Sequence, residues 1–176
     1  MLKKILVLIL AIIMLTSIGT TVMAAPSDWS YMFSNTTNFV KISQDYSATH
    51  AAIDIISNVT NPSIDGTTIK SVCAGKLGYK YNYDPDLPNT GNNSAGNYAV
   101  VVDDDGNKAG FMHMTSATSL KVGDSVSKTT TIGTVGNTGD STGPHLHYSI
   151  FSGTSNWPNS QNSIDPKTIH TDITFK

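Results

Sequence analysis

From Thr67 onward the chain is a succession of short β-prone segments closed by turns, with almost no segment of helical period. The expected strands lie within residues 68–81, 97–103, 110–114, 121–135 and 144–151, and an Asp-Gly hairpin turn at 104–107 separates two of them. Six or seven strands in about 85 residues indicate antiparallel pairing. The sequence therefore predicts a mainly β fold, a single compact domain of antiparallel sheets with an active-site groove between loops.

The composition supports this prediction and excludes several functions. Only 14% of the residues are charged, and Ser, Thr, Asn and 14 Gly, all of which weaken helix interiors, dominate the polar remainder. The chain contains no Glu and no Arg, which excludes the helical H-E-x-x-H zinc proteases and any bidentate arginine clamp. Because the chain is weakly acidic and has no basic patch, we expect no nucleic-acid partner.

The first residues have the three-part pattern of a secretory signal. Lys3 and Lys4 precede an apolar run of 11 residues, and Val22 and Ala24 occupy the −3 and −1 positions of a cleavage site. The run is shorter than the roughly 20 residues of a membrane-spanning helix. We expect a signal peptide at 1–24, a lead-in segment at 25–40 and a domain at 41–176. The mature protein is then secreted or associated with a bacterial cell wall, monomeric and without a membrane partner.

Several segments outside the expected strands also bear on function. The polar loop 82–96 contains two prolines and is too long for a simple connection, so we expect it to wall one side of a substrate groove. The glycine-rich turn 136–143 leads into the last main strand. The lone Cys73 is interpreted as a small buried residue of a strand. The lead-in is interpreted as an edge strand or flexible segment, and His170 as a surface residue.

Two pairs of residues could hold a metal. Alternation along a strand places His145 and His147 on one face, roughly 6–7 Å apart, although a solvated strand face explains an H-x-H pair more often than a site does. His50 and Asp54 converge on one ion only if their segment is helical or sharply bent. The alternating apolar residues from Ala51 to Ile55 favour a strand entered through a bend. An apolar flank also makes an unpaired Asp54 carboxylate costly.

The run 133–147, which ends in Ser-Thr-Gly-Pro-His-Leu-His, resembles the signature of the lysostaphin-type zinc endopeptidases of bacterial cell walls. His113, the stretch Val122–Val126, the pair His50-x-x-x-Asp54 and Ile164-Asp165-Pro166 resemble other motifs of that family in the right order. The resemblance covers about residues 45–170 and departs from the family at Ala52, where glycine is usual.

The resemblance implies one zinc ion per chain, held by His50, Asp54 and His147, with His113 and His145 as catalytic residues. Three protein ligands and an open fourth position are typical of catalytic zinc. The sequence does not decide which histidine is the general base. The implied function is hydrolysis of peptide bonds in peptidoglycan stem peptides or cross-bridges. The alternatives are a non-catalytic wall-binding or regulatory member of the same fold, and an adhesive β protein that happens to bind zinc. A lead-in that inhibits the enzyme by placing Asn35 or Asn38 at the open zinc position is weighed against an edge strand or flexible segment, and we favour the latter.

Overall fold

The computed structural model describes residue 26 and residues 28–33, 40–58 and 63–171. The expected signal peptide, together with Asn35 and Asn38 of the lead-in, lies outside the described residues. Within them, no helix is long and apolar enough to cross a membrane.

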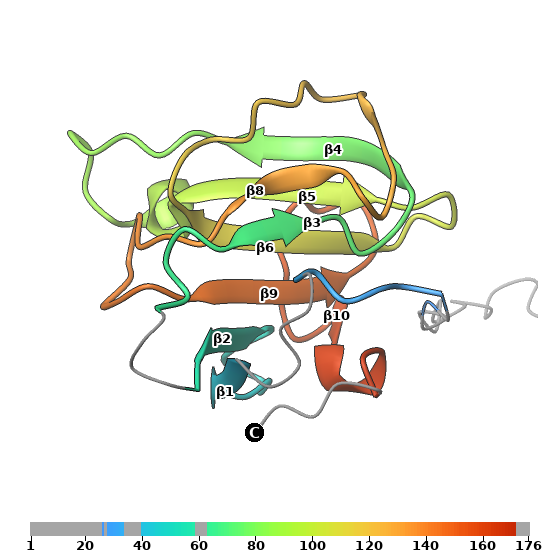
Figure 1. The fold of residues 1–176 in the computed structure, drawn as a ribbon, viewed down its shortest axis with the longest axis horizontal. Coiled ribbons are helices and arrows are strands. Elements are labelled where there is room, and N and C mark those ends of the chain that lie inside the picture. The colour runs from blue at the N-terminus through green and yellow to red at the C-terminus, as the bar shows by residue number, and fades with distance from the viewer. Residues whose placement is uncertain (1–25, 27, 34–39, 59–62, 172–176) are drawn as a thin grey trace, which may run out of the picture.

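One large antiparallel sheet forms the body of the molecule, with a small two-stranded sheet beside it (Figure 1). The large sheet has the order β1-β2-β9-β6-β5-β4-β7, with β10 paired to β9. Its strands are β1 (Val40–Gln44), β2 (Ile53–Ser57), β4 (Gly75–Tyr81), β5 (Asn97–Val102), β6 (Lys108–Met114), β7 (Ser125–Val126), β9 (Leu146–Phe151) and β10 (Ser163–Ile164). The small sheet pairs β3 (Thr68–Lys70) with β8 (Thr131–Thr134), and two short 3-10 helices are η1 (Gly91–Ala95) and η2 (Pro166–Thr168). The predicted mainly β, antiparallel fold is confirmed.

Apolar side chains pack on both faces of the large sheet, so the central strands β5 and β6 are buried along almost their whole length. Along β5, Ala99 and Val101 belong to the main apolar cluster, whereas Tyr98 and Val100 belong to a smaller cluster on the other face. The small sheet covers the main cluster through Ile69 of β3 and Ile132 of β8. Strands buried on both faces provide a rigid platform for the side chains at their ends.

Residues 28–33 are part of this core and form no strand, whereas Val40, the last residue of the lead-in, begins the edge strand β1 as expected. Trp29, Met32 and Phe33 are buried in the main cluster. The Trp29 indole donates to Asp103 Oδ2 at 3.1 Å, and the Lys70 amide donates to the Met32 carbonyl at 2.8 Å. The segment lies toward the end of the large sheet where β9 finishes (Figure 1).

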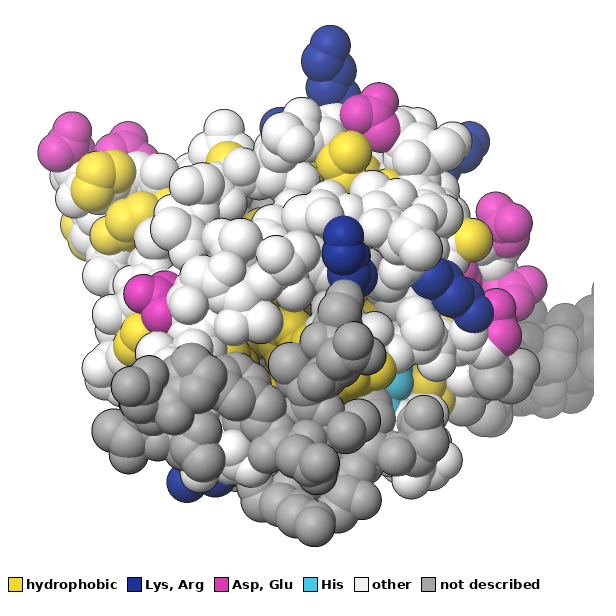
Figure 2. Space-filling view, viewed as in Figure 1, with side chains coloured by type: hydrophobic (Ala, Val, Ile, Leu, Met, Phe, Trp, Pro, Cys, Tyr) yellow, Lys and Arg dark blue, Asp and Glu magenta, His cyan; other side chains and the backbone are white. Residues whose placement is uncertain are grey.

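The surface interpretation of His170 is wrong. Its side chain is 1% exposed, packs against the ring of Tyr148 and lies with Nε2 3.1 Å from the Tyr148 hydroxyl. Cys73 is buried as expected, but it lies in the bend between β3 and β4 rather than in a strand. Charged side chains are sparse and scattered on the face shown in Figure 2, in keeping with the low charge of the sequence.

Candidate metal centre

Three predicted ligands meet where β2 pairs with β9. Asp54 lies directly opposite His147 in this antiparallel pair, which brings the two side chains together. His50 precedes β2 in a tight turn, where Ser47 and His50 exchange both backbone hydrogen bonds. The chain therefore reaches Asp54 through a bend followed by a strand, the alternative that the alternating apolar residues favoured. Ala52, at the family's usual glycine position, is buried in this bend.

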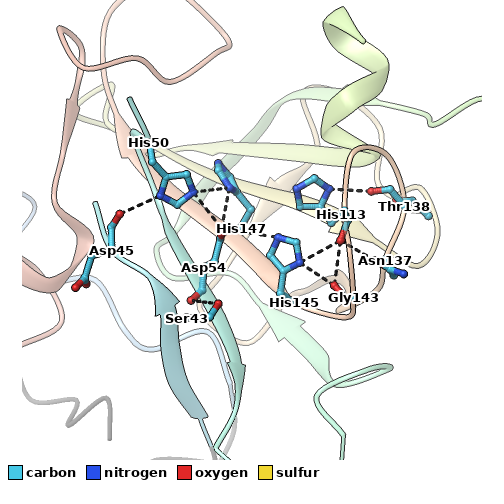
Figure 3. Close-up of polar contacts among 11 residues, drawn as sticks. Ser43, Asp45, His50, Asp54, His113, Asn137, Thr138, Gly143, His145 and His147 are labelled. Carbon is cyan, nitrogen blue, oxygen red and sulfur yellow. Dashed lines mark hydrogen bonds and ion pairs between the residues drawn. The ribbon is translucent and has the colours of Figure 1, made fainter. Parts of the chain in front are cut away.

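The three donor atoms have the spacing of a metal-binding set (Figure 3). His147 Nδ1 is 2.9 Å from Asp54 Oδ1, and His50 Nε2 is 3.3 Å from both of these atoms. Ligand atoms around a tetrahedral ion at 2.0–2.1 Å are separated by about 3.3 Å. Two imidazoles and one carboxylate also match the ligand preference of zinc. The residues present thus fit a small tetrahedral divalent ion with little movement.

The carboxylate of Asp54 is held in its charged form. Burial raises the pKa of Asp54, but the hydrogen bond and charge of His147, together with the charges of His145 and His50, outweigh it and leave the pKa below its ordinary value. Burial also lowers the pKa of His147, although Asp54 acts in the opposite direction. A charged carboxylate and a neutral imidazole are the protonation states that a metal ion requires of its ligands.

Two further histidines lie beside this set. The His113 and His145 rings are 4.6 Å apart between centroids, and His145 Nε2 lies 3.8 Å from Asp54 Oδ1. His113 Nδ1 is 2.8 Å from the Thr138 carbonyl oxygen, and His145 Nδ1 is 2.9 Å from that of Gly143. Since a carbonyl oxygen only accepts, each Nδ1 carries the proton, and in the neutral ring each Nε2 has a free lone pair.

The ring of His50 is oriented in the same way. Its Nδ1 donates to the Asp45 carbonyl oxygen at 3.1 Å, which leaves Nε2 free for a metal. Ser141 supports His145: its hydroxyl donates to Asn137 Oδ1 at 2.6 Å and lies 3.1 Å from His145 Nδ1. Three of the four site histidines therefore have their tautomer fixed by backbone carbonyls, for which the residue types of the sequence give no signal.

A β-bulge directs His113 toward the site. Asn97 pairs with Met114 and Ala99 with Phe111, so Tyr98 alone faces two residues of β6, Met112 and His113. His113 has a φ of 61°, and no other described residue except glycine has a positive φ. Such a conformation costs roughly 1–3 kcal/mol and is concentrated at functional sites.

The five residues line a groove that extends to both sides of Asp54 and His145. On one side a cavity of about 500 Å³ is lined by Ser94 and Ala95 of η1 and by Trp157. On the other side a cavity of about 470 Å³ includes Ile56, Ile64 and Pro144. Loop 82–96 thus contributes to one wall of the groove through η1. Tyr46, four residues before His50, is not among the residues that line either cavity. Its hydroxyl donates to the Ser163 carbonyl at 3.0 Å.

We expect the metal-free protein to lose stability as the pH falls from about 6.5 to about 4. Burial lowers the pKa of His113 to about 4, although its hydrogen bond to the Thr138 carbonyl acts in the opposite direction. An unfolded histidine binds its proton near pH 6.5, so the unfolded state binds more protons throughout this window and is favoured there. For His113 alone the loss is up to about 3 kcal/mol.

Urea unfolding in the presence of a chelator, at several pH values in this window, measures the effect. His113→Asn should show a shallower pH dependence, because asparagine does not titrate and tolerates a left-handed backbone. His147 adds a contribution of the same sign, so some dependence remains in the variant. Equal slopes for the wild type and His113→Asn would contradict the prediction.

A groove with a preformed His-Asp-His ligand set and two oriented imidazoles defines a metal-dependent hydrolytic site. The sequence pattern of peptidase family M23 matches residues 48–166, and the chain belongs to that family of metallopeptidases. A 57-residue stretch is 42% identical to an uncharacterized metalloprotease of Buchnera aphidicola; it covers 32% of this chain and 15% of the relative.

The solved structures that resemble this chain have the same fold. The antimicrobial peptidase lysostaphin from Staphylococcus simulans superposes with a TM-score of 0.62 at 24% identity, covering 86% of this chain and 56% of lysostaphin. A zinc-containing peptidase from Vibrio cholerae superposes with a TM-score of 0.57 at 20% identity, covering 80% of this chain and 39% of the other. This chain therefore spans little more than half of the first protein and a smaller part of the second.

Proposed function

We propose that this protein is an exported zinc endopeptidase that hydrolyses peptide bonds in the stem peptides or cross-bridges of peptidoglycan. The observation that carries the proposal is the convergence of His50, Asp54 and His147 beside the imidazoles of His113 and His145, which line the same groove. Membership of family M23 and the resemblance to lysostaphin support the substrate class. The signal-like residues 1–24 support export.

Each residue has a role in this proposal that follows from its contacts. His50, Asp54 and His147 hold the metal; bound zinc supplies Lewis acidity toward water and toward the scissile carbonyl. His113 and His145 have protonated Nδ1 atoms and free Nε2 atoms, so either can accept a proton from the attacking water and return it to the leaving amine. The chain has no glutamate that could take this role.

The shape of the groove favours an internal peptide bond over a chain end. Space for substrate continues on both sides of Asp54 and His145, so an extended peptide can cross the site in either direction. The first cavity has the large aromatic side chain of Trp157 beside the small residues of η1, whereas the second cavity is lined by aliphatic and small polar side chains. We propose that loop 82–96 contributes to the choice of peptide through η1.

We expect the purified mature protein to contain about one zinc ion per chain and to lyse bacterial cell walls. A chelator should abolish lysis, and added zinc should restore it. Metal analysis measures the zinc content, and the release of soluble wall fragments measures lysis. A non-catalytic wall-binding member of the fold would sediment with walls without releasing fragments. Stoichiometric zinc without lysis of several wall types would therefore reject the proposal and favour that alternative.

A further inference from the structure

His113 is held by a residue that the metal site itself does not use. The His113 ring donates from Nδ1 to the carbonyl of Thr138, which belongs to the turn 136–143 (Figure 3). The bulge turns His113 toward the site, where its ring packs against His145 and His147. The hydrogen bond to the Thr138 carbonyl distinguishes the two ring nitrogens, because it keeps the proton on Nδ1 and leaves Nε2 unprotonated.

The hydroxyl of Thr138 fastens this carbonyl to the two strands that form the bulge. The hydroxyl donates to the Met114 carbonyl at 2.8 Å and accepts from the backbone N–H of Asn97 at 2.9 Å. Met114 follows His113 on β6, and Asn97 is the paired residue at the start of β5. With both neighbours bonded to one hydroxyl, the Thr138 backbone cannot shift without breaking two partly buried hydrogen bonds.

The same turn is pressed against the end of loop 82–96. A Cβ at Gly96 would lie 2.3 Å from the Thr138 carbonyl oxygen, and a Cβ at Gly139 would lie 2.3 Å from the Gly96 amide nitrogen. Such close contact between two backbones requires glycine on both sides. The Asp140 amide donates to the Ser94 carbonyl at 2.8 Å, and the Asn89 side chain donates to the Gly139 carbonyl at 2.9 Å.

Buried amides make loop 82–96 a firm support for this contact. Asn93 is 4% exposed; the two hydrogens of its Nδ2 are shared among three loop carbonyls, and its Oδ1 accepts from the Asp84 backbone amide. Asn97 links the loop to the bulge, since its Oδ1 accepts from the Tyr83 amide while its Nδ2 donates to the Met114 carbonyl. The loop is thereby hydrogen-bonded to the strand that carries His113.

We propose that Thr138 is a positioning residue for His113. Its hydroxyl holds the carbonyl that keeps the His113 proton on Nδ1, so that Nε2 faces the groove as a proton acceptor. The support from loop 82–96 completes this arrangement, so the loop acts on the orientation of His113 as well as on the groove wall. The expected effect on turnover rests on the proposed function, in which His113 transfers protons. The effect of Thr138 on the tautomer of the His113 ring does not depend on that function.

The test compares Thr138→Val, which removes the hydroxyl at nearly constant volume, with Thr138→Ser, which keeps it. Thr115→Val is the matched control, because Thr115 also donates its hydroxyl to a nearby carbonyl, that of Val135 at 2.8 Å, rather than to a group that His113 bonds. Long-range ¹H–¹⁵N spectra of the metal-free full chain report the tautomer of His113. Steady-state kinetics of the zinc-loaded protein report kcat and KM separately.

We expect Thr138→Val to convert His113 from the Nδ1–H form to a mixture of tautomers. Its kcat should fall about 10- to 100-fold, the scale of a misplaced catalytic group, with KM and zinc content changed less than about twofold. Thr138→Ser should restore both readouts, and Thr115→Val should leave both at wild-type values. If Thr138→Val does not fold, Thr138→Ala removes the same hydroxyl without placing a methyl group against the Asn97 amide.

Retention of the Nδ1–H form in folded Thr138→Val or Thr138→Ala would overturn the proposal, and so would equal impairment of the serine and valine variants. The ¹H–¹⁵N spectra report the tautomer of His113 whether or not the protein is catalytically active. If the wild type cleaves no peptidoglycan, the proposed function fails while the tautomer still decides whether Thr138 positions His113.

Discussion

His147→Ala is expected to bind zinc at least ~100-fold more weakly than the wild type and to have no measurable hydrolytic activity. The substitution removes one of three donors and also the closest partner of Asp54, at 2.9 Å. Changes to residues that only orient metal ligands typically cost 10–100-fold in affinity, so the loss of a ligand should cost at least as much. Competition against a chromophoric chelator measures the affinity, and circular dichroism verifies that the fold is retained.

The matched control for this variant is His145→Ala, the same substitution two residues earlier on the same strand face. A folded His147→Ala protein that retains one tightly bound zinc ion would show that His147 is not a ligand. The set formed by His50, Asp54 and His147 would then have to be abandoned, because the spacing of the donor atoms depends on all three.

His145→Ala is expected to keep its zinc and to lose turnover by roughly 10²- to 10⁴-fold, the usual contribution of a general acid or base. His145 Nε2 is 3.8 Å from Asp54 Oδ1, farther than the 2.9–3.3 Å that separates the three ligand atoms from one another. Its Nδ1–H bond to the Gly143 carbonyl presents Nε2 to the groove as a proton acceptor. Zinc content and kcat, measured on the same preparation, separate the two effects.

Loss of zinc from a folded His145→Ala protein would contradict this prediction and would make both members of the H-x-H pair ligands. His145→Gln provides a second comparison, because glutamine can hydrogen-bond but cannot exchange a proton near neutral pH. If His145→Gln turns over at the wild-type rate, His145 is not an acid or base in the reaction.

The strands were predictable wherever β-branched and aromatic residues alternate between turn residues. The segments expected between Thr68 and Phe151 contain the observed strands β3, β4, β5, β7, β8 and β9 and all of β6 except its first two residues, and the hairpin turn between β5 and β6 lies where it was expected. The two-residue strand β10 carries too short a pattern to be recognised. Burial of Trp29, Met32 and Phe33 was not predicted, because their positions follow neither the period of a strand nor that of a helix.

The sequence pointed to the three side chains that converge here, but not to the groups that orient them. The H-x-H spacing indicates that His145 and His147 share a strand face, and the structure places both beside Asp54. The groups that orient the rings are mostly backbone carbonyls of Asp45, Thr138 and Gly143. Because every residue has a backbone carbonyl, the loop conformation decides which carbonyls orient the rings. The residue types in the sequence therefore do not reveal them. The bulge at His113 is likewise a property of strand register.

The anchoring of residues 28–33 has a consequence for how this domain can be joined to other molecules. Trp29 and Met32 anchor the segment 28–33, which runs near the end of β9 (Figure 1), whereas His145 directly precedes that strand and His147 is its second residue. A tether, surface or second module attached ahead of Asp28 would thus pull on the end of the sheet remote from the groove. Immobilising the domain on a solid support through that end would leave the groove accessible to solvent.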